Sequence, residues 1–470
     1  MERLTRTARG SRLPPGRAGS NLRRLDNSPL ARVAVWLIWL ITARLIIPGF
    51  FDYKVDITEA TKSEELYNKI IWLVFACGSV WIFSLRMDMA VRVLRASGAP
   101  FLALLLYTAC SVLWSMDAVA SLSRFFHLVV IVLACLGVTI FGWHERRFQE
   151  VVRPVITFFL LGSLIFGLVA PDLAIQEPVY PHTEYYWGGL TIGKNALGAI
   201  ASTGVIFWVH GWASREVKPF AAACGAALSF TLIMLARAAT YMLSTILVCV
   251  LLLLVLRSAR GMRRYMPYII VGFVVLTALY GLAVLRVVPG LDVLLTPITA
   301  LSGRDTTFTN RALIWQIAFE HIGLNPMLGT GYGAFWANVQ PGTPAYEFFV
   351  PRMFFNPGEC HDGYIEIIND LGYVGLLLLF GYLWSYLSRA IRLLKTNYTQ
   401  ATLYLAVLFQ QLLSGLTESN WLWIDAEMLI FTLATICLAR HQLDMRSSQR
   451  VRASIVPDSR AVSLPARSRR

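Results

Sequence analysis

The chain has 470 residues, of which 56% are hydrophobic and only 15% are charged. Soluble domains carry about 25% charged residues, so this composition excludes an ordinary soluble protein and favours a membrane protein. The formal net charge of +14 does not indicate nucleic-acid binding, because the basic residues gather in alternate loops and in both tails. That distribution is typical of membrane proteins, whose cytoplasmic segments are rich in lysine and arginine.

The apolar residues form continuous runs long enough to cross a hydrocarbon core of about 30 Å as helices. Alternating apolarity would favour a barrel, but these runs do not alternate. We predict an all-α polytopic membrane protein with about twelve transmembrane helices. The expected spans are residues 32–50, 67–85, 99–115, 124–142, 152–170, 195–212, two within 219–257, 267–287, 371–391, 400–416 and 424–440.

The same pattern divides the chain into five regions. Residues 1–31 are expected to form a disordered basic cytoplasmic tail, and residues 32–288 the first nine helices. Residues 289–370 form a large exported loop, residues 371–440 the last three helices, and residues 441–470 a second basic cytoplasmic tail. The first span lacks a small-residue cleavage site after it, so we expect it to be retained. Only Cys360 of the seven cysteines lies in the large loop, so no disulfide framework is expected.

A transporter is the competing class. A twelve-span facilitator normally shows two similar halves joined by a long central connector. Here the central connector, 213–218, is short, and the longest loop lies off-centre and outside. This asymmetry disfavours a transporter and leaves it as an alternative.

The large loop contains a candidate anion site at Arg311. Thr309 is expected to cap a helix running to about His321, which places Arg311 in its first turn. Free backbone N–H groups and the helix dipole favour anions there, and a guanidinium can bind phosphate through two nitrogens. A surface ion pair is the equal alternative for Arg311, and Arg304 is more simply a loop charge. The expected apolar stripe of this helix is Ala312, Trp315, Ala318, Phe319 and Ile322.

Three polar residues lie at the outer ends of the middle spans. Arg237 stands between two apolar spans, where a charge is costly unless it meets water, a partner or a ligand, so it is a functional candidate. Lys194 and Asn195 occupy a comparable boundary, although Lys194 could equally reach the interface as a snorkelling side chain. The GTGYG segment at 329–333 lacks the spacing of a dinucleotide-binding motif and predicts a tight turn.

His361 is expected to open a short helix, residues 361–370, that runs into the tenth span. Its ordinary pKa of about 6.5 would leave a neutral fraction able to accept a proton from a hydroxyl group. A purely structural role is the alternative. Glu366, five residues later, could orient the histidine or line the site. No histidine, cysteine or carboxylate spacing typical of a metal site is present, so we expect neither a metal nor a cofactor.

Five segments occur in an order that is informative as a set: GKNALG (193–198), LAR (235–237), FTNRALIW (308–315), NPMLGTGYGAF (325–335) and HDGYIEIINDLGYVG (361–375). Together they resemble the O-antigen ligase and polysaccharide polymerase superfamily of bacterial inner membranes, over roughly residues 185–440. The resemblance implies a helical membrane fold of the GT-C type, with a large periplasmic loop, 289–370, over the site. It also implies metal-independent transfer of a glycan from an undecaprenyl-diphosphate carrier to an acceptor hydroxyl.

The resemblance assigns roles to three residues. Arg237 and Arg311 look like the family's diphosphate-binding arginines, and His361 looks like the histidine that activates or orients the acceptor. Lys194, Asn195, Arg304 and Glu366 are accessory candidates. The chain departs from the family at Ala236, Asn310 and Asp362, where Ser, Gly and Asn are more usual.

The motifs do not separate ligases from polymerases. The TESNWLW stretch at 417–423 favours an exopolysaccharide polymerase that joins lipid-linked repeat units. A ligase that transfers the glycan to lipid A-core or another acceptor is the alternative. Expected partners are membrane lipids, a chain-length regulator and a flippase, and no nucleic acid. The loop aromatics Trp336, Tyr346, Phe348 and Phe349 could stack on sugars or serve as core and interface residues.

Overall fold

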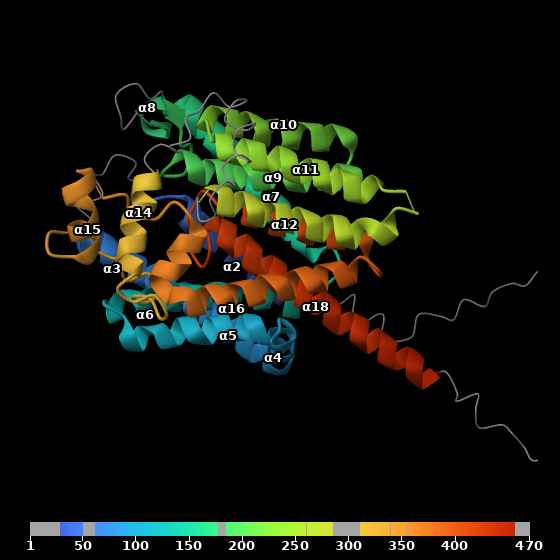
Figure 1. The fold of residues 1–470 in the computed structure, drawn as a ribbon. Helices are drawn as coiled ribbons and strands as arrows, with labels where there is room; N and C mark the ends of the chain where they lie inside the picture. The colour runs from blue at the N-terminus through green and yellow to red at the C-terminus, as the bar shows by residue number, and fades with distance from the viewer. Residues whose placement is uncertain are drawn as a thin grey trace, which may run out of the picture.

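The computed structural model describes residues 29–49, 62–176, 185–259, 261–284, 311–338, 340–354 and 356–455. Long helices run side by side, and shorter helices gather at one end of the bundle (Figure 1). The helices of the first half are α2 (Pro29–Ile46), α3 (Lys62–Leu85), α4 (Met87–Ala96), α5 (Ala99–Cys110), η2 (Ser111–Trp114), α6 (Ala118–Ile140), α7 (Arg147–Val169), α8 (Pro171–Ala174), α9 (Lys194–Ala213) and α10 (Pro219–Ala236). Those of the second half are α11 (Ala239–Arg257), η3 (Arg263–Tyr265), α12 (Met266–Val284), α14 (Arg311–Ile322), α15 (Pro344–Met353), α16 (Gly363–Leu393), α17 (Tyr398–Ser414) and α18 (Ala426–Ile455).

The prediction of a multi-pass helical membrane protein is confirmed. Among the described residues, nine helices are long and apolar enough to cross a membrane, and α4 with α5, bent by 101°, makes a tenth if counted as one span. Helices α17 and α18 occupy the last two predicted spans but are not among these ten. The count of twelve therefore stays a prediction.

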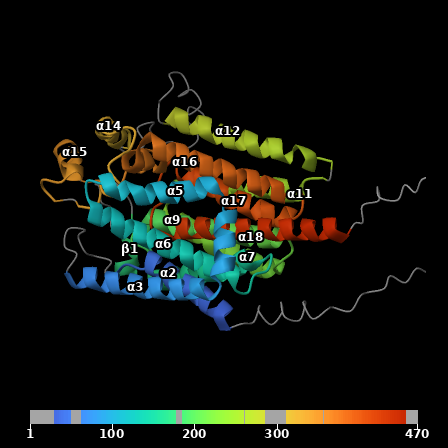
Figure 2. The same ribbon diagram turned by 90° about the horizontal axis from the view of Figure 1, so that it is seen from below.

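Burial separates the lipid-facing helices from the central ones. In the most apolar part of α9, 72% of the residues are buried, whereas in the corresponding parts of α3 and α12 only 28% are buried. Figure 2 shows α3 and α12 on opposite sides of the bundle with α18 between them. Helix α9 packs on α7, α10, α11 and α17. Helix α9, which begins with Lys194 and Asn195, is therefore held from several sides.

Two boundaries differ from those expected. Helix α2 begins at Pro29, inside the expected tail 1–31, because proline is favourable in the first helical turn; residues 1–28 lie outside the described chain. Helix α18 continues to Ile455 rather than ending near 440. The segment 441–455 contains no glycine or proline to stop the helix, and Pro457 follows it.

The described residues depart from the all-α prediction at one small hairpin. Strands β1 (Ile175–Gln176) and β2 (Tyr186–Trp187) pair antiparallel after α8. They lie between the predicted spans 152–170 and 195–212, and β2 packs against α9 and α10.

Helix α16 is broken where the large loop meets the membrane bundle. Gly372 has φ 68° and ψ −173°, which interrupts the helix. The segment 326–331 fills the break: Tyr373 N–H donates to Pro326 O at 2.9 Å, and Gly331 N–H donates to Asp370 O at 2.9 Å. Backbone groups freed within a bundle need such partners because lipid offers none. The expected tight turn at GTGYG is confirmed, since Gly329, Gly331 and Gly333 all have positive φ.

Helices α14 and α15 share a second hydrophobic core with the start of α16. Trp336 and Phe349 are buried in this core, so their rings are not exposed for stacking on a sugar. Tyr346 and Phe348 are half-buried. The expected helix at Arg311 is present, although its Thr309 cap lies outside the described residues. Its buried face is Ile314, Trp315, Ile317, Ala318, His321 and Ile322. Ala312 and Phe319 were expected in this face but are exposed, because α14 turns Ile314 and Ile317 inward instead.

Candidate functional site

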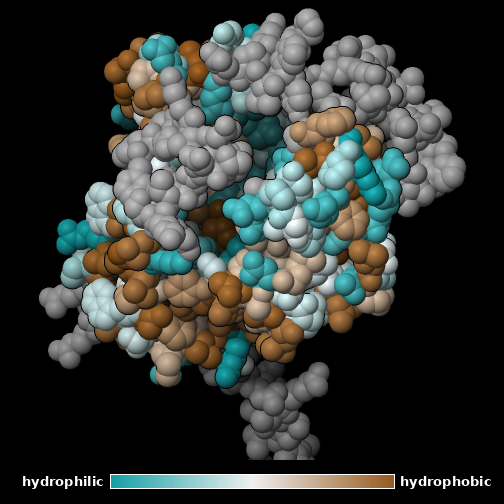
Figure 3. Space-filling model, turned by 90° about the vertical axis from the view of Figure 1, so that its left-hand side faces the viewer, coloured by the Kyte–Doolittle hydropathy of each residue, from teal (hydrophilic) through white to brown (hydrophobic). Residues whose placement is uncertain are grey.

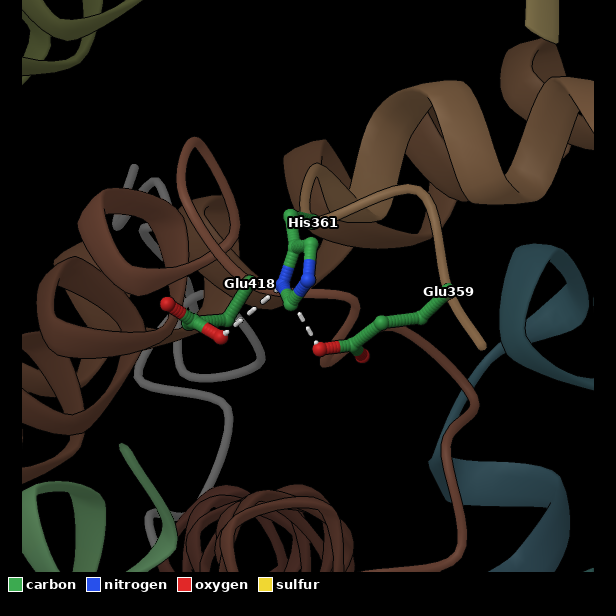
Figure 4. A group of neighbouring side chains, drawn as sticks. All are labelled: Glu359, His361 and Glu418. Atoms are coloured by element: carbon green, nitrogen blue, oxygen red, sulfur yellow. Dashed lines mark ion pairs between the residues drawn. The ribbon is translucent and has the colours of Figure 1, made fainter. Parts of the chain in front are cut away.

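Four charged side chains from distant parts of the chain meet at the end of the bundle that carries α14. The Arg311 Nη2 atom lies 2.9 Å from Glu418 Oε1, and the Glu418 Oε2 atom lies 3.8 Å from His361 Nδ1. His361 Nδ1 also lies 2.8 Å from Glu359 Oε1 (Figure 4). We call Arg311, Glu359, His361 and Glu418 the Glu418 cluster, because Glu418 joins the arginine to the histidine.

Three separate elements supply the Glu418 cluster. Arg311 opens α14, Glu359 and His361 lie on the segment between α15 and α16, and Glu418 lies between α17 and α18. Glu418 is only 8% exposed. Figure 3 looks onto this end of the molecule, where the surface is hollowed near its middle and hydrophilic residues border the hollow. A buried carboxylate between two cationic groups at this end of the molecule suits the binding of a polar ligand.

Local capping fixes the position of His361. Asp362 Oδ1 accepts hydrogen bonds from the N–H groups of Tyr364 and Ile365, both at 2.9 Å, and so caps α16. His361 stands directly before this cap with φ 50°, a left-handed conformation uncommon outside glycine. Gly363 N–H donates to Gly415 O at 2.8 Å, which ties the start of α16 to the loop that carries Glu418. Asp362, a departure from the family pattern, thus serves as the helix cap.

Glu366 positions both halves of the cluster without touching the histidine ring. Its Oε2 atom accepts hydrogen bonds from Cys360 N–H at 2.8 Å and from Ser419 Oγ at 3.1 Å. Cys360 precedes His361 and Ser419 follows Glu418 in the sequence. The expectation that Glu366 could orient the histidine therefore takes an indirect form, through the backbone beside it.

The electrostatics of His361 differ from the sequence expectation. Burial lowers the pKa of its imidazole, but contacts with Glu359 and Glu418 outweigh burial and raise the pKa to about 9. The ordinary value of about 6.5 was therefore the wrong expectation, because neither carboxylate could be placed from sequence spacing. Burial also raises the pKa of Asp362 to about 7, opposed by its two backbone hydrogen bonds and by Arg311.

Arg237 lies in the turn between α10 and α11. It is an exposed C-cap with φ 54° and ψ 30°. One turn later, the Tyr241 hydroxyl donates to Glu427 Oε2 at 3.2 Å, at the start of α18. This contact places the α10–α11 turn at the same end of the bundle as the loop that carries Glu418.

The remaining accessory candidates are Lys194, Asn195 and Arg304. Lys194 opens α9 and lies over the Tyr186 ring at 5.5 Å, on the side of the β1–β2 hairpin. Asn195 follows it in the first turn and is half-buried. Arg304 lies outside the described residues. The structure thus links Arg311 to His361 through Glu418, with Glu366 bound to the residues beside His361 and Glu418. Arg237 lies in the turn between α10 and α11, and Lys194 and Asn195 lie at the start of α9.

Sequence reasoning missed three charged residues of this region. Glu359 and Glu418 complete the cluster, and Arg124 of α6 lies over the Trp423 ring at 4.4 Å. Glu418 could have been noticed as a carboxylate between two apolar spans, a placement that marks functional candidates.

The cluster also contains a set of atoms able to hold a metal ion. One ligand atom each from Glu359, His361 and Glu418 lies within 4.8 Å of the other two. No sequence spacing predicted this set, because Glu418 is remote from the other two residues and is brought in by the fold.

Comparisons with known proteins agree with the motifs. A model of the O-antigen ligase family matches residues 195–380, a range that includes Arg237, Arg311 and His361 but not Glu418. The exopolysaccharide production protein ExoQ of Rhizobium meliloti (strain 1021) is 29% identical over 230 residues, 47% of this chain and 48% of that protein. The chain therefore aligns with about half the length of this relative. Over the region that carries the motifs, the chain is therefore similar to the O-antigen ligase family and to a protein of exopolysaccharide production.

Proposed function

We propose that this protein is a polymerase that joins undecaprenyl-diphosphate-linked oligosaccharide repeat units in exopolysaccharide synthesis. The observation that carries this proposal is the Glu418 cluster, in which an arginine and a histidine stand on either side of one buried carboxylate. Similarity to a protein of exopolysaccharide production supports the polymer as the product. We place the site at the periplasmic face of the bacterial inner membrane, with a flippase and a chain-length regulator as partners.

Arg311 would bind the diphosphate of the donor, with Arg237 as a second cation from the turn between α10 and α11. Negative charge grows on the lipid diphosphate as it departs, and fixed guanidinium groups stabilise that charge. Arg311 Nη2 lies 2.9 Å from Glu418 Oε1. Donor binding therefore has to share Arg311 with Glu418 or displace the carboxylate.

His361 would accept the proton of the acceptor hydroxyl through Nε2, while Nδ1 faces Glu359 and Glu418. A carboxylate behind an imidazole orients the ring and increases its basicity. In the transfer step, the hydroxyl oxygen bonds to the sugar carbon and the bond from that carbon to the phosphate oxygen breaks. The proton passes to Nε2 and the lipid diphosphate leaves with the bonding electron pair. None of these roles requires a metal ion.

A ligase is the second candidate, favoured by the description of the matching family model. The two functions differ in what a loss mutant accumulates. A polymerase mutant should accumulate single lipid-linked repeat units on the outer side of the membrane. A ligase mutant should accumulate polymerised chains still attached to the carrier, and a flippase mutant should accumulate single units inside.

The direct test combines a deletion strain with the His361→Gln variant. We expect both to accumulate single lipid-linked units and to make no polymer, while the variant is expressed and inserted normally. Polymer formation at the wild-type rate by purified His361→Gln would contradict the proton-acceptor role. If polymerised chains attached to the carrier accumulate instead, the protein is a ligase rather than a polymerase.

A further inference from the structure

We propose that Glu359, His361 and Glu418 form an inhibitory site for a Zn²⁺ ion, bound through one imidazole nitrogen and two carboxylate oxygens. The ligand atoms are His361 Nδ1, Glu359 Oε1 and Glu418 Oε2. The nitrogen lies 2.8 Å from the first oxygen and 3.8 Å from the second. Tetrahedral zinc with bonds of about 2.0–2.2 Å needs its ligand atoms roughly 3.3–3.5 Å apart, so small side-chain shifts complete the geometry.

The donor set selects the class of metal. Mg²⁺ and Ca²⁺ prefer six or more oxygen ligands, whereas zinc accepts a mixed nitrogen and oxygen set with one open position. His361 Nδ1 is shielded from solvent and makes no hydrogen bond of good geometry, yet it points toward the two carboxylates. It is therefore a nitrogen ligand whose natural partner, other than a proton, is a metal ion of the zinc class.

Neighbouring residues hold these three side chains in place by hydrogen bonds and ion pairs, as the residues around metal ligands commonly do. Arg311 contacts the other oxygen of Glu418 at 2.9 Å, which leaves Oε2 directed at His361. Glu366 anchors the residues next to His361 and Glu418 through Cys360 and Ser419. By contrast, the more exposed pair of His144 and Glu150 has one carboxylate and belongs to no three-ligand group among the described residues.

Zinc bound at Nδ1 would draw electron density from the imidazole, so Nε2 would become a poorer proton acceptor. Metal binding itself does not depend on the proposed function, but the inhibition rests on it. Removal of zinc would restore transfer, which makes the site compatible with catalysis that needs no metal.

The test uses the full-length protein, freed of any affinity tag, stripped with chelator and held in lipid nanodiscs. Calorimetric titration with ZnCl2 should give one site that Mg²⁺ and Ca²⁺ do not occupy. His361→Gln, Glu359→Gln and Glu418→Gln should each weaken binding at least tenfold. Glu320→Gln and His144→Ala, which alter a loop carboxylate and a histidine outside the cluster, should bind as the wild type does. Thermal unfolding checks that each variant is folded.

Each outcome has a fixed meaning. Equal zinc affinity in the wild type and in folded His361→Gln, or equal binding of Mg²⁺, would overturn the site. A transfer assay over the same zinc range should lose activity with the same midpoint as binding, and EDTA should restore the activity. Zinc binding without loss of transfer would support the metal site and disprove inhibition through His361. If the zinc-free wild-type protein shows no transfer activity at all, the proposed function fails, whereas the binding result still stands.

Discussion

At the scale of single residues, Glu418 links the two cationic residues of the candidate site. Its two oxygens face Arg311 and His361, the residues for which we propose donor and acceptor roles. Taking away one partner of a buried ion pair leaves the other charge uncompensated, at a cost of about 3–5 kcal/mol. Variants at this site therefore need a check of folding beside each activity.

The first prediction concerns Arg311. Arg311→Ala should reduce polymer formation by about 10²–10³-fold, the usual loss when one group that stabilises transition-state charge is removed. Arg311→Lys should restore part of the activity, because an ammonium supplies charge but not the planar fork. Polymer yield in membranes with matched protein amounts measures this. Arg352→Lys is the matched control, since Arg352 lies in the same loop and pairs with the exposed Glu320.

The second prediction concerns pH. Because the pKa of His361 is raised to about 9, the imidazole is mostly protonated at neutral pH, and the transfer rate should rise from pH 7 toward pH 9. Glu359→Gln removes a negative charge that favours the protonated ring, so the pKa should fall and the rise should move to lower pH. Rate profiles of purified protein test this, with Glu320→Gln as control. An identical profile in Glu359→Gln would show that Glu359 does not tune the histidine.

The sequence singled out two of the four residues of the Glu418 cluster, and the local surroundings of each residue explain why. Arg311 and His361 carry local signals, a helix start and a loop–span boundary. Glu359 and Glu418 carry weaker ones, because their importance arises from contacts between segments remote in the chain. The pKa of His361 depends on those contacts, so its direction could not be derived from the sequence.

At the scale of elements, the break in α16 connects the loop to the bundle. A Cβ atom built on Gly372 would lie 2.2 Å from the Met327 carbonyl oxygen, and φ at Gly372 is 68°. Both facts require glycine at this position. The sequence predicted a short helical segment that runs into the span 371–391, but it did not predict the break, because hydropathy does not detect one residue of unusual conformation.

The third prediction follows from that break. Gly372→Ala should destabilise the protein by at least about 1–3 kcal/mol, the cost of a strained backbone, with a further penalty from the clash. It should lower the thermal unfolding temperature and the activity together. Gly381→Ala is the matched control in the same helix, where an added Cβ meets its nearest atom at 3.8 Å. Equal unfolding temperatures for the two variants would show that 326–331 does not pack tightly into the break.

At the scale of the whole molecule, the distribution of positive residues predicts how the protein is oriented in the membrane. Positive residues in alternate loops predict both termini on the cytoplasmic side and residues 289–370 on the periplasmic side. As a fourth prediction, Glu347→Cys, exposed on α15, should react with a membrane-impermeant thiol reagent added outside intact cells. The comparison should use a background lacking native exposed cysteines such as Cys77 and Cys224. If the cysteine at position 347 is labelled only after the membrane is opened, α15 lies on the cytoplasmic side and the predicted orientation is wrong.

The sequence predicted the helical bundle well because span length and continuous apolarity are imposed by the bilayer. It predicted helix ends less well, as α18 shows, because a helix continues into water wherever nothing stops it. The β1–β2 hairpin and the bend between α4 and α5 carry little hydropathy signal and were not expected.

The docking of 326–331 into α16 also limits how this protein can be recombined with its relatives. A chimaera that exchanges only the large loop would dock a foreign segment against the resident break, where the hydrogen bonds to Asn369, Asp370 and Tyr373 depend on the path of both backbones. The unit of exchange is therefore the loop together with α16. Engineers who wish to transplant acceptor preference should place their crossovers before α14 and after α16, and natural recombination is subject to the same restriction.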